Sequence, residues 1–325
     1  MNQSVQIFLT VTLMTVFAQV SDAQSVANQS SNKKSVARSD SNKSLTPTHS
    51  DIPYGAHERN KLDIWCAKSD RPTPLVVFIH GGGFRNGDKS KWRTSPELKL
   101  LLEQGVSCAS INYPFRDSKP IQEILHDAAR AVQFLRSKAA EWNLDKNRFA
   151  AQGGSAGAGT SLWLTMRDDL ADPAASDPVL KESSRVCACV LNSTQATYHI
   201  GKWASFLGEM PAAWAKSPDE GPAFYGLKTA EELSSLAGQK LAEECDMLAW
   251  ISKDDGPVLC TVKHPEGPIQ DRNHMVHHPK HAEEIKKVCE SKGVSCRIVR
   301  DGDVDVATEC VEFLLAQLKV NLAGR

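Results

Sequence analysis

A serine set between small residues is the first feature of this chain that could do chemistry. Residues 152–157 read QGGSAG, so Ser155 is the third residue of a Gly-x-Ser-x-Gly pattern. Residues 148–152 (RFAAQ) predict a short strand before it, and residues 156–166 predict a helix after it. On such a turn the serine hydroxyl is exposed, its backbone is strained, and the helix amides favour negative charge. The pattern favours a nucleophile over a merely tight or phosphate-binding turn.

A glycine run follows an earlier strand-like segment. Residues 80–84 read HGGGF, directly after the apolar residues 75–79 (LVVFI). Three glycines leave backbone N–H groups uncovered, and such groups can donate to an oxygen that becomes negatively charged. His80 belongs to the turn itself, so we expect it to be structural. Together with Ser155, this loop predicts an oxyanion hole.

A histidine-rich stretch is the third candidate. Residues 269–281 read IQDRNHMVHHPKH. Four of the chain's ten histidines lie in it: His274, His277, His278 and His281. Their spacing would line one face of a helix, but Pro279 cannot lie inside that helix and restricts the residue before it. We therefore expect a loop followed by a helix that starts at Pro279, with His274 and His281 exposed to solvent.

A metal site is the alternative interpretation of two stretches, the histidine-rich residues 269–281 and the acidic residues 301–312. The histidines lack an HExxH-like pairing, and the chain has no CxxC pair for a thiolate zinc site. Residues 301–312 (DGDVDVATECVE) match acidic positions of a calcium loop, but Val306 replaces the glycine that such a loop needs, and a strand precedes it. We expect no bound metal.

Short apolar segments alternate with amphipathic ones through most of the chain. Strands are predicted at residues 75–79, 106–111, 148–152, 186–191, 258–262 and 294–299. Helices are predicted at residues 95–104, 120–142, 156–166, 279–291 and 304–320. Alternating strands and helices predict a mostly parallel sheet covered on both faces. Residues 195–253, which contain Trp203 and Trp214, break this order and predict an insertion over the carboxyl end of the sheet, where ligands bind.

The HGGGF loop, the GGSAG turn and the insertion together resemble the α/β-hydrolase family, in the esterase and lipase branch that carries an HGGG loop. The resemblance spans residues 52–320 and implies an α/β-hydrolase fold, a mostly parallel central sheet flanked by helices with a helical lid insertion. It implies acyl transfer through an acyl-enzyme on Ser155, with oxyanion donors at Gly82, Gly83 and Ala156. This chemistry needs no cofactor.

The end of the chain departs from the family pattern. That pattern places an acid after the strand that follows the lid, and the catalytic histidine after the last strand. Here no histidine occurs after His281, and the last predicted strand is followed by Asp301, Asp303 and Asp305.

An exchanged arrangement could restore a base. We hypothesise that His277 or His278 is the base and that a carboxylate of the 301–305 loop, first of all Asp301, orients it. Glu266 and Asp271 are alternative acids within the histidine stretch. Such an exchange is possible because geometry, and not chain order, defines a catalytic triad.

The N-terminus predicts export. Residues 7–20 are uncharged and short for a membrane span, and small residues precede a possible cut after Ala23. We expect a signal peptide at residues 1–23, with an uncleaved anchor as the alternative. Residues 24–50, rich in Ser, Asn and Lys, predict a disordered linker before a hydrolase domain at residues 51–325. The protein would then be secreted or periplasmic, without a stable membrane span.

The composition is that of an ordinary globular protein, with 24% charged residues among 325 and a net charge of −1. It provides no basic field for nucleic acid. We expect the nine cysteines to be mostly free, buried thiols. The predicted function is a secreted serine hydrolase of carboxylic esters, acting on a small-molecule or polysaccharide-linked ester. A catalytically dead fold that binds a ligand or partner is the alternative, and a peptidase would need a pocket for a peptide terminus.

Overall fold

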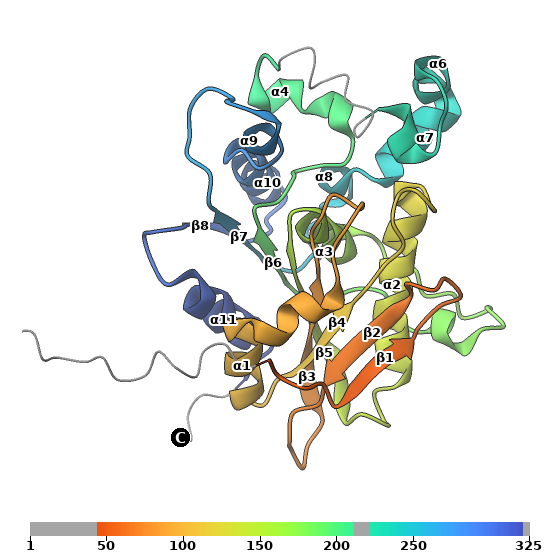
Figure 1. Cartoon of the computed structure of the whole chain (residues 1–325), viewed down its shortest axis with the longest axis vertical. Coiled ribbons are helices and arrows are strands. Elements are labelled where there is room, and N and C mark those ends of the chain that lie inside the picture. The colour runs from red at the N-terminus through yellow and green to blue at the C-terminus, as the bar shows by residue number, and fades with distance from the viewer. Residues whose placement is uncertain (1–43, 211–220, 321–325) are drawn as a thin grey trace, which may run out of the picture. The chain divides into compact units, whose positions relative to one another are not determined.

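The computed structural model describes residues 44–210 and 221–320, which are arranged around one central sheet (Figure 1). In these ranges the strands are β1 (His49–Pro53), β2 (Lys61–Trp65), β3 (Thr73–Ile79), β4 (Ser107–Ile111), β5 (Leu144–Gly154), β6 (Cys189–Asn192), β7 (Val258–Val262) and β8 (Cys296–Arg300). Their order is β1-β2-β4-β3-β5-β6-β7-β8. The pairs from β4 to β8 are parallel, and β1 and β2 pair antiparallel with their neighbours. The predicted mostly parallel sheet is confirmed.

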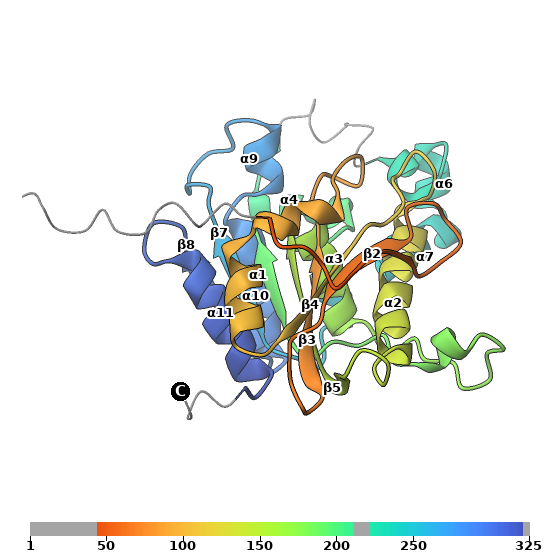
Figure 2. The same cartoon turned by 60° about the horizontal axis from the view of Figure 1, so that its bottom comes forward.

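Helices cover both faces of the sheet. They are α1 (Pro96–Glu103), α2 (Ile121–Ser137), α3 (Ala156–Met166), α4 (Ala204–Leu207), α6 (Ala230–Ser234), α7 (Leu236–Glu244), α8 (Met247–Trp250), α9 (Arg272–Val276), α10 (Lys280–Ser291) and α11 (Val306–Gln317). Figures 1 and 2 show α1 and α11 side by side along the sheet. Across the described ranges, no helix has the length and apolar character needed to cross a membrane.

The central strand β3 shows why both faces need cover. Its sequence TPLVVFI is apolar on both sides, because alternate side chains of a strand point to opposite faces. Leu75 and Val77 pack in the core cluster that includes residues of α2, α3 and α10, and Val76 packs in the cluster that includes residues of α1 and α11. Burying each such side chain contributes about 1.5–3 kcal/mol. The apolar strands therefore lie between two layers of helices.

Every predicted strand and helix has a counterpart, with shifted ends. The strand predicted at residues 148–152 is longer, because β5 begins at Leu144, and the one predicted at residues 186–191 is shorter. The strands β1 and β2 were not predicted. The sequence HSDIP of β1 is largely exposed at the sheet edge, so it carries little apolar pattern.

The folded region begins earlier than predicted. Residues 44–50 were assigned to the disordered linker, yet the N–H of Leu45 donates to the carbonyl of Arg93 (2.8 Å) and the indole of Trp65 donates to the carbonyl of Leu45 (3.1 Å). His49 then starts β1. Backbone pairing orders this polar segment, which composition alone does not reveal. The predicted signal peptide, residues 1–23, and the rest of the predicted linker lie outside the described residues.

The segment predicted as a lid, residues 195–253, connects β6 to β7. Its described parts hold α4, α6, α7 and α8, which Figure 1 shows above the sheet. Trp203 is buried, and Trp214 lies outside the described residues. All nine cysteines are free thiols, and seven of them are buried.

Candidate active site

Ser155 occupies the sharp turn between β5 and α3. Its backbone has φ 49° and ψ −118°, a left-handed conformation that a serine adopts only at a cost in free energy. The flanking glycines allow the turn. A Cβ on Gly153 would lie 2.2 Å from the carbonyl oxygen of Gly157, and one on Gly157 would lie 2.0 Å from that of Ile79. The GGSAG pattern is therefore a steric requirement of the turn that exposes the serine.

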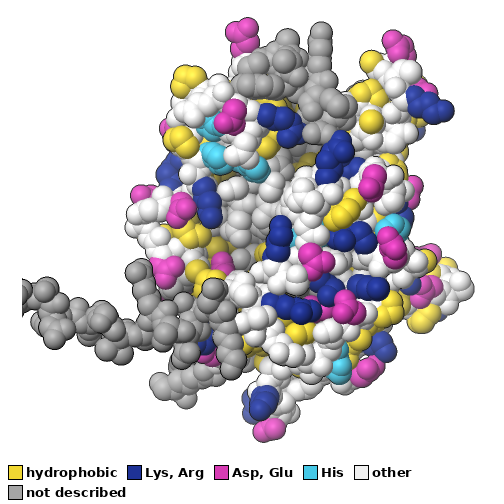
Figure 3. All heavy atoms as spheres, viewed as in Figure 1, with side chains coloured by type: hydrophobic (Ala, Val, Ile, Leu, Met, Phe, Trp, Pro, Cys, Tyr) yellow, Lys and Arg dark blue, Asp and Glu magenta, His cyan; other side chains and the backbone are white. Residues whose placement is uncertain are grey.

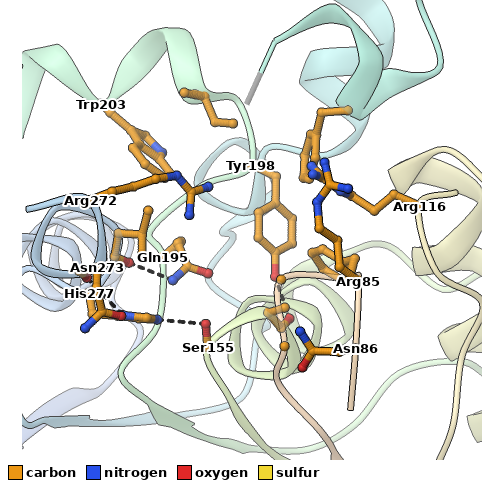
Figure 4. Close-up of a pocket in the computed structure, with 17 residues that line it drawn as sticks. Arg85, Asn86, Arg116, Ser155, Gln195, Tyr198, Trp203, Arg272, Asn273 and His277 are labelled. Carbon is orange, nitrogen blue, oxygen red and sulfur yellow. Dashed lines mark hydrogen bonds between the residues drawn. The ribbon is translucent and has the colours of Figure 1, made fainter. Parts of the chain in front are cut away.

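His277 is the imidazole that meets Ser155. Its Nε2 lies 2.8 Å from Ser155 Oγ, as the dashed line in Figure 4 marks. Burial, and next the nearby His264 and Arg272, lower the pKa of His277 to about 4. The ring is therefore neutral at neutral pH, and Nε2 can accept the serine proton. Of the two histidines predicted as the base, the structure brings this one to the nucleophile.

The orienting group of His277 is an amide. His277 Nδ1 lies 3.0 Å from the carbonyl oxygen of Asn273 and 3.0 Å from its Oδ1. Asp301, predicted for this role, is exposed at the end of β8, where its N–H donates to the carbonyl of Val262. The structure thus corrects the exchanged-acid hypothesis. The physical reason is local: in α9, Asn273 is one helical turn before His277 and reaches its ring directly.

The two alternative acids have other partners. The Asp271 side chain caps α9 and accepts from the N–H of His274 at 2.7 Å. Glu266 pairs with Arg300 at 2.5 Å. Each carboxylate therefore stabilises the loop and helix around the site, and neither of these contacts involves His277.

The remaining histidines of the stretch are structural. His278 Nε2 lies 2.9 Å from the carbonyl of Gly267 and its Nδ1 accepts from the N–H of Lys280, so His278 is corrected as a candidate base. His274 and His281 were expected to be exposed, and this was wrong, because both are buried. Both nitrogens of each ring have hydrogen-bond partners, so no polar atom of either buried ring lacks a partner.

The predicted oxyanion donors lie in the wall of the pocket that contains Ser155. Gly82, Gly83 and Ala156 line the same pocket as the serine. Within the described residues, none of their backbone N–H groups donates to a protein acceptor. Gly82 has φ 118°, and a Cβ there would lie 2.0 Å from the carbonyl of Asn86. The loop conformation thus requires glycine at this position of the pocket wall.

His80 supports this loop from behind. Its Nδ1 lies 2.8 Å from the carbonyl of Gly81, and its ring stacks on Tyr113 with centroids 4.3 Å apart. The side chain is fully buried, and burial lowers its pKa to about 4. His80 thus packs under the turn, as expected from its place in the HGGGF sequence.

The pocket above Ser155 has a volume of about 690 Å³. Aromatic side chains of the 195–253 segment form part of its wall, among them Tyr198, Trp203 and Phe224. Arginine side chains also line it, and Figure 4 places Arg272 on the Trp203 side and Arg116 across the pocket. Figure 3 shows a hollow on this face of the molecule, with histidine side chains gathered beside it. The cavity has room for a small acyl or alcohol group.

Sequence reasoning missed Asn273 and Tyr198. Tyr198 donates to the carbonyl of Ala156 (2.6 Å), and Gly159 makes room for its ring. A signal for Asn273 was present, since Asp271 is a suitable helix cap and Asn273 and His277 are four residues apart. In residues 44–210 and 221–320, no group of three or more His, Cys, Asp or Glu side chains is placed to hold a metal ion.

Part of the chain is similar to a known protein family and to named esterases. The family model BD-FAE matches residues 62–195, which include the HGGGF loop and Ser155 but not the histidine stretch. The chain is 34% identical over 108 residues to the probable isoprenylcysteine alpha-carbonyl methylesterase ICMEL2 of Arabidopsis thaliana, covering 33% of this chain and 25% of that protein. It is 32% identical over 137 residues to esterase LipQ of Mycobacterium tuberculosis, covering 41% and 30%. The chain thus matches less than a third of the length of these two relatives.

Solved structures share the fold over most of the described chain. A truncated form of a carbohydrate esterase from gut microbiota superposes with a TM-score of 0.66 at 16% identity, covering 85% of this chain and 98% of that one. A thermophilic esterase of Thermogutta terrifontis with bound propionate superposes with a TM-score of 0.58 at 16% identity, covering 84% and 96%. At these identities the likeness shows the fold.

Proposed function

We propose that the chain is an esterase of the α/β-hydrolase family and that it hydrolyses carboxylic esters through an acyl-enzyme; the match of residues 62–195 to BD-FAE and the similarity to named esterases support this. One observation carries the proposal. Ser155 Oγ lies 2.8 Å from His277 Nε2, at the floor of a pocket that the glycine loop also lines. A nucleophile, a base and free amide donors then meet at one point, which is what acyl transfer requires.

The first half of the reaction forms the acyl-enzyme. His277 Nε2 takes the proton of Ser155 Oγ as the oxygen attacks the ester carbonyl carbon. The carbonyl oxygen becomes negatively charged and accepts from the N–H groups of Gly82, Gly83 and Ala156. The tetrahedral intermediate collapses, the bond to the alcohol oxygen breaks, and the imidazolium gives its proton to the departing alcohol. One oxyanion donor contributes about 10²–10³ in rate in a comparable site.

The second half repeats these steps with water. His277 takes a proton from the water as it attacks the acyl carbon, and the acid leaves when Ser155 recovers the proton. The burial that lowers the pKa of His277 leaves Nε2 unprotonated, and so ready to accept a proton, at the start of each half. Ser155, His277 and the amides of the glycine loop thus supply the nucleophile, the base and the oxyanion donors of both halves.

The substrate we propose is a small-molecule or polysaccharide-linked ester with a short acyl chain. A pocket of about 690 Å³ with an aromatic wall fits a small group and could stack a sugar ring. We also propose that the protein is secreted or periplasmic, with a cut after Ala23, which rests on the apolar segment at residues 7–20.

The alternative is a catalytically dead fold that binds a ligand. The missing family histidine after β8 motivated it, and the contact between Ser155 and His277 argues against it. Turnover of p-nitrophenyl acetate by the full chain decides between the two. We expect wild type to be active and Ser155→Ala and His277→Gln each to lose at least about 10³-fold in kcat.

Labelling supports this test. A p-nitrophenyl phosphonate should modify wild type at Ser155, one group per chain, and should not modify Ser155→Ala. The matched control is Ser205→Ala, since Ser205 is an exposed serine and lies outside the pocket lining. Equal turnover by wild type and Ser155→Ala would reject the esterase and favour the binding protein.

A further inference from the structure

The position that a carboxylate holds in a Ser–His–Asp arrangement is held here by Asn273. Because His277 Nε2 faces the Ser155 hydroxyl, its Nδ1 must carry the ring proton and needs an acceptor. Two acceptors lie at 3.0 Å, the backbone carbonyl and the side-chain Oδ1 of Asn273. Both come from one residue, one turn earlier on α9.

The α9 helix is anchored so that this turn is fixed. The Asp271 side chain caps its start, and His274 Nε2 lies 3.0 Å from the carbonyl of Pro265 in the preceding loop. Met275 is buried in a small apolar cluster with Trp203. A helix of five residues would not be stable alone, so these contacts set the distance between Asn273 and His277.

A second imidazole settles which way the amide points. His264 Nε2 lies 3.4 Å from Asn273 Nδ2, and the His264 ring is parallel to that of His277, with centroids 5.6 Å and planes 10° apart. When Nδ2–H donates to His264, Oδ1 is directed at the Nδ1–H of His277. A reversed amide would place a donor against a donor.

Resting on the proposed function, we propose that Asn273 is the positioning residue of His277 and that His264 fixes the direction of its amide. No carboxylate contributes to this arrangement within the described residues. The titratable and charged groups that face His277 are Arg272 on α9, His264 after β7 and His281 on α10. The enzyme therefore orients its base with neutral oxygens and forms the imidazolium without a counter-charge.

This arrangement has a consequence that a Ser–His–Asp enzyme lacks. Without a carboxylate, the imidazolium is less favoured, so the base stays unprotonated in mild acid. Substituting Asn273→Asp adds the missing charge at an atom 3.0 Å from Nδ1. Since Asn273 is exposed to solvent, the shift should be at the low end of the range for close pairs, about one pH unit upward.

The test combines two pH profiles. The first is kcat/KM for p-nitrophenyl acetate from pH 4 to 8, read at a wavelength insensitive to phenol ionisation. The second is the pKa of His277 from ¹⁵N imidazole spectra of the full chain, which needs no turnover. We expect Asn273→Asp to move the acidic limb of the kcat/KM profile to higher pH and to raise the pKa of His277 by the same amount. Asn273→Leu should lower kcat by about threefold to tenfold with little change in KM, because the backbone carbonyl still accepts.

A double-mutant cycle isolates the role of His264. His264→Phe keeps a stacked ring but removes the acceptor, so it should lower kcat about as much as Asn273→Leu. In the Asn273→Asp background the same exchange should cost little, because both carboxylate oxygens accept. Gln270→Leu, an exposed exchange in the same loop, is the matched control and should leave both profiles unchanged.

Superimposable His277 titrations in wild type and Asn273→Asp would overturn the inference. The inference would also be overturned if the double variant His264→Phe, Asn273→Leu lost as much kcat as the two single losses added together. The proposed function fails separately if turnover does not depend on Ser155. In that case the spectra still decide whether Asn273 and His264 set the pKa of His277. Since Asn273 is exposed, its substitution should leave thermal unfolding nearly unchanged, which separates positioning from folding.

Discussion

Protonation of the buried His281 should couple acid conditions to the stability of the active site. The side chain is fully buried, and its Nδ1 accepts from the N–H of Ala196 at 3.1 Å. Its Nε2 lies 3.1 Å from the carbonyl of Met275 on α9. The perturbation is the exchange His281→Gln, which keeps a polar group but removes the titrating one.

The magnitude follows from the pKa. Burial is the main cause that lowers the pKa of His281 from 6.5 to about 3, and the neighbouring His277 and His278 contribute to this lowering. Because the folded pKa is below the unfolded one, the unfolded chain binds the proton more tightly, so stability falls as the pH drops below 6.5. Between pH 7 and pH 5 this one group should remove about 2 kcal/mol from the free energy of unfolding.

Urea unfolding at pH 7 and pH 5 measures this directly. We expect the wild-type pH difference to exceed that of His281→Gln by about 2 kcal/mol. Gln270→Leu is the control, because it is an exposed exchange that removes no titrating side chain, so it should not change the pH difference. Identical pH differences in wild type and His281→Gln would refute the reasoning. The result bears on function because His281 also holds the end of the helix that carries His277.

Three further predictions concern folding and packing. Gly157→Ala places a Cβ 2.0 Å from the carbonyl of Ile79, so it should destabilise the chain by more than about 4 kcal/mol, measured as lost soluble expression or thermal unfolding. Trp203→Ala should cost about 3 kcal/mol in urea unfolding, since the ring is 2% exposed. Lys89→Met should lower the free energy of unfolding by about 3–5 kcal/mol in urea. The reason is that the fully buried Asp63 carboxylate, 2.6 Å from Lys89 Nζ, loses this partner. An unchanged unfolding midpoint would contradict the importance of the pair.

Local sequence patterns determined the parts of this protein that depend on local sterics. The small residues around Ser155 predict its turn because only glycine avoids the backbone of Gly157 and Ile79. The alternating apolar strands and amphipathic helices predict the layers, because each element must bury its apolar side. The edge strand β1 escaped prediction, since its order comes from pairing with β2 and not from its own pattern.

The partner of the base was decided by tertiary structure alone. His277 is 122 residues from Ser155, and neither spacing nor composition distinguishes it from His278. The two ring nitrogens of His278 form hydrogen bonds with the backbone of Gly267 and Lys280. Carboxylates near the end of the chain made Asp301 a reasonable orienting group by sequence. The choice of Asn273 depends on a five-residue helix that is too short to show a period and exists only because the surrounding loop and core hold it.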